Sequence, residues 1–416
     1  MPDQPVHESA GVVSPHAATW LRAATAVLVV LAVGFLAYGI QHAWLRNGDI
    51  DASTREDEYI LFRQGVYPNG HLEEPPATSG RLYSVYPPYA FPMFAFFFEP
   101  GGLLQARILI QLLSLASLVV MGLFAWRVLA PYGEPVAMLG AVAGAAMAGN
   151  GTALMVGQFS IICMGLIVLQ IVCLQRRRPV LAGICWALAM IKPQIALPFG
   201  LLFLFPGQAI GALVGTAILA ALTLLACFWT ELPLQKVVGY WSWGMSLKFT
   251  EHKGALNPGG LAAALGVDSR GTQRVVAVAL TLIAVPLVWF MRRLGQQALV
   301  PVAGFCAVAG MFFAYHRYYD NVMLFPALVA LIALTAASRR PALAVLTAVM
   351  IGRLLLPQRV VDYVPLHGLL QAAIWTAAGI LPLRLASTAV PRQETLSGEA
   401  GQMAASTVSS QPANRA

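Results

Sequence analysis

Long hydrophobic runs alternate with short polar connections along most of this chain. A helix needs about 20 apolar residues to cross a membrane, and somewhat fewer where protein surrounds it. The runs predict spans at 20–44, 103–128, 136–154, 158–175, 179–191, 195–206, 208–229, 275–291, 299–315, 320–337, 341–357 and 365–386. The pattern therefore predicts an all-α polytopic membrane protein with about 11–12 transmembrane helices. The number stays open because the runs beside Lys192-Pro193 form either two helices or one.

Composition supports a membrane protein and argues against a nucleic-acid partner. Of the 416 residues, 58% are hydrophobic and 11% are charged, whereas soluble domains carry about a quarter charged residues. The net charge is +8. The basic residues lie at the ends of hydrophobic runs and do not form a basic face, so the excess charge does not indicate nucleic-acid binding.

Basic residues in short loops predict the orientation of the chain, because such loops stay in the cytoplasm. Three arginine clusters fall on one side when the N-terminus is placed inside: 176–178, 292–293 and 339–340. We therefore expect a cytoplasmic N-terminal segment, a transmembrane domain and a disordered cytoplasmic tail, at residues 1–19, 20–386 and 387–416. The loops at 45–102 and 230–274 then face the periplasm or cell exterior, and the protein belongs in the cell (inner) membrane.

The first outer loop is unusually acidic and rich in tyrosine for so apolar a chain. Asp51 follows directly on the end of the first hydrophobic run, and a carboxylate there could act as a general base. Asp49 is the alternative base. The segment up to Gly65 predicts an amphipathic helix on the membrane surface, and 88–99 predicts an interfacial or re-entrant piece. A merely solvated loop is the competing interpretation, and it is the one we favour for Glu56.

Polar residues also interrupt the later hydrophobic runs. Lys192 lies within an apolar stretch, where ionisable residues are candidates for function. The alternative is a lysine that reaches to the interface. Gln158 and Gln194 are predicted at the same outer helix ends, which favours a shared site.

A third polar cluster occupies residues 315–320 between two hydrophobic runs. His316 and Arg317 could neutralise a phosphate group, since the planar guanidinium suits phosphate oxygens. Tyrosines such as Tyr319 could instead be interfacial anchors. That alternative does not account for His316 or Asp320.

Together these segments resemble glycosyltransferase family 87 of the GT-C superfamily. The resemblance covers roughly residues 20–340 and depends on the order and spacing of several weak motifs. Its motifs are Asp51, Gly65 with Tyr67, Tyr86-Pro87-Pro88, Gly157-Gln158, Ala189 to Pro193, and His316 to Asp320. The order Tyr67-Pro68 departs from the Pro-Tyr order that the family often shows, and the pair Asp49/Asp51 leaves the choice of base open.

The resemblance implies transfer of a hexose, typically mannose, from a polyprenyl-phosphate-sugar donor to a lipid or glycan acceptor, with inversion and without a cofactor or metal. Asp51 would be the base, and Lys192, His316 and Arg317 would bind the donor phosphate. The substrate would also be lined by Tyr86, Gln158, Gln194, Tyr319 and Asp320. A secondary transporter of about twelve spans is the main alternative, followed by a polymerase or ligase of cell-surface polysaccharide.

Overall fold

A computed structural model of the protein describes residues 14–45, 50–69, 84–251, 269–313, 316–357 and 367–388. The described part is helical and contains no strand. The α-helices are α1 (Pro15–Leu45), α2 (Ile50–Arg63), α3 (Ala90–Phe98), α4 (Gly102–Leu129), α5 (Glu134–Ala143), α6 (Ala148–Val156), α7 (Ser160–Gln175), α8 (Pro179–Ala189), α9 (Pro193–Ala196), α10 (Ala209–Thr230), α11 (Leu234–Glu251), α13 (Ser269–Met291), α14 (Leu299–Phe313), α15 (Phe325–Ser338), α16 (Pro341–Leu355) and α18 (His367–Thr388). Short 3₁₀ helices are η1 (Ala130–Tyr132), η2 (Leu197–Leu204), η3 (Arg292–Ala298) and η4 (Tyr318–Leu324).

The predicted all-α membrane fold is confirmed. Within the described residues, six helical stretches are long and apolar enough to cross a membrane, and four shorter apolar helices accompany them. The stretch predicted as one span at 136–154 contains two helices, because the chain turns at 144–147 between α5 and α6. Pro193 begins α9 after a break at Lys192, as expected from the extended backbone that proline imposes on the residue before it.

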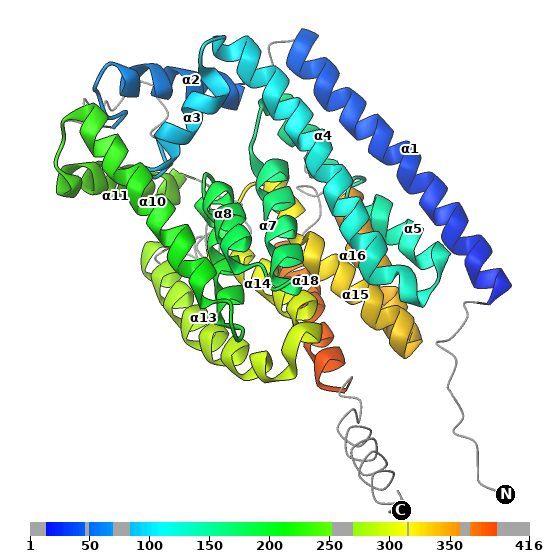
Figure 1. Cartoon of the computed structure of the whole chain (residues 1–416). Coiled ribbons are helices and arrows are strands. Elements are labelled where there is room, and N and C mark those ends of the chain that lie inside the picture. The colour runs from blue at the N-terminus through cyan, green and yellow to red at the C-terminus, as the bar shows by residue number, and fades with distance from the viewer. Residues whose placement is uncertain are drawn as a thin grey trace, which may run out of the picture.

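The amphipathic helix predicted in the first outer loop is α2, which lies with α3 and α11 at one end of the molecule (Figure 1). Its apolar face packs against protein: Tyr59 and Phe62 are 3% and 0% exposed. The Phe62 ring stacks on Phe91 of α3 at 5.2 Å. Gly65 ends the helix with φ +78, a conformation that suits a glycine at a helix C-terminus. The loop helices therefore form a packed cap.

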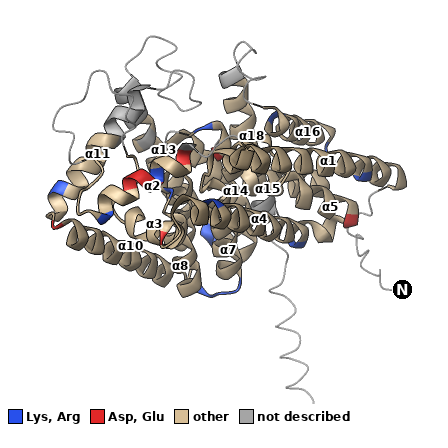
Figure 2. Ribbon diagram, turned by 90° about the horizontal axis from the view of Figure 1, so that it is seen from above, with Lys and Arg blue, Asp and Glu red and all other residues tan. Residues whose placement is uncertain are grey.

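Charged residues are sparse on the helical bundle and gather on α2 and at helix ends (Figure 2). One of these acids connects the cap to a long helix, since Glu56 accepts a 2.7 Å hydrogen bond from the backbone N–H of Leu103. A carboxylate is favourable at a helix N-terminus, where backbone N–H groups lack partners. The solvated role that we favoured for Glu56 is therefore wrong.

Helices α1 and α6 pack closely through glycine. A side chain at Gly39 would collide with the backbone carbonyl of Gly151, and one at Gly151 would collide with that of Phe35. Small residues allow such close approach where helices associate within a membrane. This contact holds α6 in place, and α6 leads directly to the polar site described below.

We predict that Gly39→Ala destabilises the protein while Gly34→Ala does not. The first change forces α1 away from α6 and should cost about 1–3 kcal/mol, as overpacking does. At Gly34, on the same helix, nothing lies within 4 Å of an added Cβ. Thermal unfolding of the purified protein in detergent measures the difference. Equal melting temperatures for the two variants would contradict the packing argument.

Candidate active site

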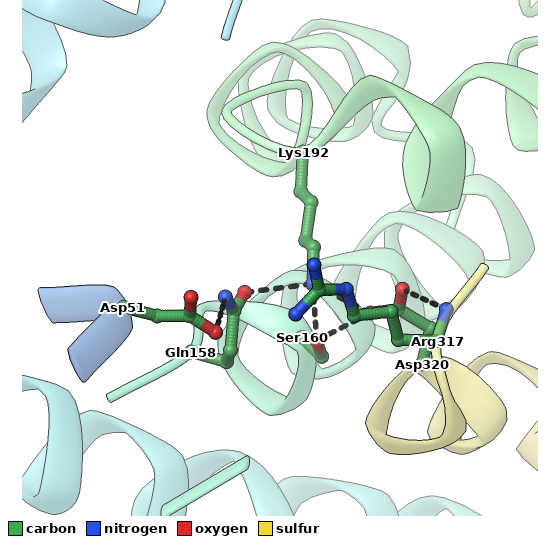
Figure 3. A network of polar contacts seen from close by, with 6 residues as sticks. All are labelled: Asp51, Gln158, Ser160, Lys192, Arg317 and Asp320. Carbon is green, nitrogen blue, oxygen red and sulfur yellow. Dashed lines mark hydrogen bonds and ion pairs between the residues drawn. The ribbon is translucent and has the colours of Figure 1, made fainter. Parts of the chain in front are cut away.

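Four places where helices begin or break bring polar residues together inside the apolar bundle (Figure 3). They are the first turn of α2, the connection between α6 and α7, the break before α9, and the start of η4. A regular transmembrane helix satisfies its own backbone groups and offers few polar groups to a site. Irregular backbone between such helices is tolerated where protein covers it. The breaks therefore create the site.

Lys192 lies at the centre of the site and is 3% exposed. Its ammonium group lies 2.8 Å from Oε1 of Gln158, 2.7 Å from Oγ of Ser160 and 2.5 Å from Oδ1 of Asp320. These three partners match the three protons of the ammonium group. The Tyr319 ring lies on another side, with its centroid 4.6 Å from Nζ. Lys192 is thus held inside the protein, and it does not reach to the interface.

Asp320 balances the charge of Lys192 and is itself 1% exposed. Its Oδ1 also accepts a 2.7 Å hydrogen bond from the Ser160 hydroxyl. Its Oδ2 accepts one of 3.1 Å from the backbone N–H of Arg317. A buried ion pair is stable only when its remaining hydrogen-bonding capacity is satisfied, and this pair meets that condition.

Asp51 joins the network through Gln158, whose Nε2 donates a 2.5 Å hydrogen bond to Oδ2 of the carboxylate. The same amide accepts from Lys192 through its oxygen, so the lysine fixes the direction in which the amide donates. Close approach of α2 requires Gly157, which has φ +71 and would place a Cβ 2.6 Å from that of Ala52. The predicted Gly157-Gln158 motif therefore both admits α2 and orients its carboxylate.

A second buried ion pair lies on α2, and it was not predicted from the sequence. Arg55 and Glu58 are 2.6 Å apart, and each side chain is 7% exposed. The Arg55 guanidinium lies over the Tyr86 ring, 4.8 Å from its centroid. Burial raises the pKa of the Tyr86 hydroxyl well above its ordinary value; the charge of Arg55 opposes this shift and that of Asp51 adds to it. Arg55 follows Asp51 by four residues, a spacing that places both on one helix face and could have identified it.

The structure brings together most of the predicted residues. Asp51, Tyr86, Gln158, Lys192, Tyr319 and Asp320 lie in or beside the network. Arg317 extends its side chain toward the same centre (Figure 3). Gln194 is half-buried and forms no hydrogen bond with the network residues described here. Asp49 lies outside the described residues. Ser160 was not predicted, although its position three residues after Gly157 places a hydroxyl at a helix start.

His316 is buried beside the ion pair between the two apolar stretches that precede and follow it. Burial lowers the pKa of its imidazole from 6.5 to about 4; the charge of Asp320 opposes this shift and that of Lys192 adds to it. The ring is therefore neutral at pH 7. It can donate or accept a hydrogen bond, but it carries a positive charge only if a bound anion raises its pKa.

Comparison with known proteins assigns the chain to a family. The family model described as glycosyltransferase family 87 matches residues 85–316, which is more than half of the chain. The matched region includes Gln158, Ser160, Lys192 and His316 and ends shortly before Asp320. None of the curated proteins and none of the solved structures matches the chain significantly.

We predict that Lys192→Met is strongly destabilising, because it leaves Asp320 as an uncompensated buried charge. Breaking a buried pair in this way costs about 3–5 kcal/mol. The double variant Lys192→Met/Asp320→Asn should recover most of this loss, because neither position then carries an uncompensated charge. Thermal unfolding measures both. Gln194→Met, two residues along the chain, is the control and should change stability by less than 1 kcal/mol, roughly. A double variant as unstable as the single one would contradict the ion-pair argument.

We also predict that His316 makes the protein less stable in mild acid. Its pKa is lower in the folded protein than the ordinary 6.5, so unfolding takes up a proton as the pH falls below that value. Between pH 8 and pH 5 the expected loss from this group is about 2 kcal/mol. His316→Gln should remove that part of the pH dependence, whereas His16→Gln, at an exposed position on α1, should retain it. Identical pH profiles of melting temperature for wild type and His316→Gln would refute the assignment.

Proposed function

The chain belongs to glycosyltransferase family 87, and from this premise we propose that it transfers a hexose, typically mannose, from a polyprenyl-phosphate donor to a lipid or glycan acceptor. The reaction would take place on the extracytoplasmic side of the cell membrane. The arginine clusters 176–178, 292–293 and 339–340 support this side. Each cluster adjoins one end of a helix (α7, α14 or α15) whose other end leads to the site, as expected if these loops are cytoplasmic and the site is not. A polyprenyl tail would remain in the bilayer while its sugar reached the site.

The observation that carries the proposal is the oriented carboxylate of Asp51. One of its oxygens accepts from Gln158, which leaves the other oxygen available to take a proton from a hydroxyl. A general base must lie within hydrogen-bond reach of the proton it removes. The half-buried position of Asp51 at the first turn of α2 is compatible with the approach of an acceptor.

The proposed reaction is a single displacement. Asp51 accepts the proton of the acceptor hydroxyl while the hydroxyl oxygen forms a bond to the anomeric carbon of the hexose. The bond between that carbon and the phosphate oxygen breaks, and its electron pair leaves with the lipid phosphate. Attack from the face opposite the phosphate inverts the anomeric centre.

The departing phosphate gains negative charge, so it needs cationic or hydrogen-bonding partners. We assign direct contact to Arg317, whose planar fork suits two phosphate oxygens, and to His316, which would be protonated as the anion binds. Lys192 could contact the phosphate only by giving up one of its three partners. Its proposed role is therefore to hold Gln158 and to add positive charge nearby.

The test is sugar transfer by purified protein from polyprenyl-phosphate-mannose to an acceptor-lipid extract. We predict that Asp51→Asn lowers kcat by about 10²–10⁴-fold, the usual contribution of a general base, without lowering the melting temperature. Asp57→Asn, on the exposed face of the same helix, is the matched control and should retain activity. Because Asp49 remains the alternative base, Asp49→Asn is measured in parallel. Full activity in Asp51→Asn with loss in Asp49→Asn would transfer the role to Asp49.

A further inference from the structure

A cavity lies at the ends of α7 and α15 that are remote from the candidate active site. Helices α4, α7, α14 and α15, together with η1 and η3, line a partly open cavity of about 470 Å³. Ser160 begins α7 at the active site, and Gln175 ends it at the cavity. At 1.5 Å per residue the two sites are about 22 Å apart. The cavity is therefore distinct from the proposed glycosyl-transfer site.

The lining of the cavity combines positive charge with apolar walls. Arg127 and Arg176 supply two guanidinium groups, and no acidic residue lines the cavity. Neither arginine forms an ion pair with any residue that the structure describes. Apolar residues such as Phe124, Val172 and Val300 form much of the remaining wall. Uncharged polar residues complete the lining: Tyr132, Gln175, Gln296 and Gln297. An anion with an attached hydrocarbon part would complement both features.

A third feature of the cavity calls for a hydrogen-bond donor. The Oε1 atom of Gln296, which lines the cavity, is buried and has no hydrogen-bond partner. Leaving a buried acceptor unpaired costs about 1–3 kcal/mol. Once the amide turned this atom toward the cavity, a ligand that carries a hydroxyl group as well as a negative charge would satisfy it. Arginines at helix C-termini are common because of the helix dipole, but the dipole does not account for the cavity or for the unpaired amide oxygen.

We propose that this cavity binds the headgroup of an anionic membrane phospholipid whose headgroup also carries a hydroxyl, as in phosphatidylglycerol. The phosphate lies between Arg127 and Arg176, the headgroup hydroxyl donates to Gln296, and the acyl chains follow the apolar walls into the bilayer. Basic pockets between transmembrane helices on the cytoplasmic side bind anionic lipid headgroups in this way. The bound lipid connects α4 and α14 to α7 and α15, and the other ends of α7 and α15 adjoin the active site. The proposal does not depend on the donor or acceptor of the glycosyl transfer.

The test uses the full-length, delipidated protein in detergent, titrated with dioleoyl phosphatidylglycerol and followed by native mass spectrometry. Arg127→Gln/Arg176→Gln should weaken binding roughly tenfold or more, because each arginine near the membrane surface raises the affinity for anionic lipid by about fivefold. Arg178→Gln/Arg340→Gln removes two exposed arginines from the connections that follow α7 and α15, outside the cavity lining, and should leave the affinity unchanged. An equal loss in both double variants would mean general surface charge and would overturn the proposal.

Two further measurements identify the ligand and guard against misfolding. Gln296→Leu, which changes no charge, should weaken phosphatidylglycerol binding roughly fivefold, the worth of one hydrogen bond. Phosphatidylglycerol should raise the melting temperature of the wild type, as a ligand of the folded state does, and should have less effect on Gln296→Leu. Equally tight binding of dioleoyl phosphatidylcholine would overturn the anionic headgroup. Competition by glycerol 3-phosphate at the same concentration as the lipid would overturn the lipid source.

Discussion

The buried ion pair of Lys192 and Asp320 is the interaction on which the rest of the site depends. It joins two segments separated by 128 residues, each at a break between helices. Neither charge could remain in so apolar a bundle alone, because an unpaired buried charge costs several kcal/mol. The pair therefore ties the end of α8 to the start of η4, and the two remaining protons of Lys192 extend its influence to Ser160 and Gln158.

Hydrogen bonds connect that pair to α2 through Gln158. Gln158 can donate to Asp51 because its own oxygen already accepts from Lys192, so a buried lysine orients a carboxylate that it does not touch. The cap formed by α2 and α3 is held in turn by stacked aromatic rings and by the contact of Glu56 with the start of α4. Reactive groups are placed most accurately when a second layer of contacts supports them, and this arrangement supplies such a layer.

The two ends of the bundle differ in whether their cationic side chains are paired with carboxylates. At the α2 end, Lys192 and Arg55 are each paired with a carboxylate, which leaves a site close to neutral and suited to a substrate that brings its own phosphate. At the opposite end arginines predominate, and Arg127 and Arg176 face a cavity without acids. Membership of a glycosyltransferase family decides against the alternative of a secondary transporter. The family does not distinguish simple transfer from polymerisation or ligation of polysaccharide.

The sequence alone determined the helical membrane fold, the break at Lys192-Pro193, and the residue types of the site, because hydrophobic run length and proline act locally. It also indicated Asp51, Gln158, Lys192 and Asp320, since polar residues stand out in an apolar chain. Only the tertiary structure decided which of them touch. Pairing across 128 residues depends on how helices pack, so the partners of Lys192, the buried pair of Arg55 and Glu58, and the structural role of Glu56 were not visible in any local pattern.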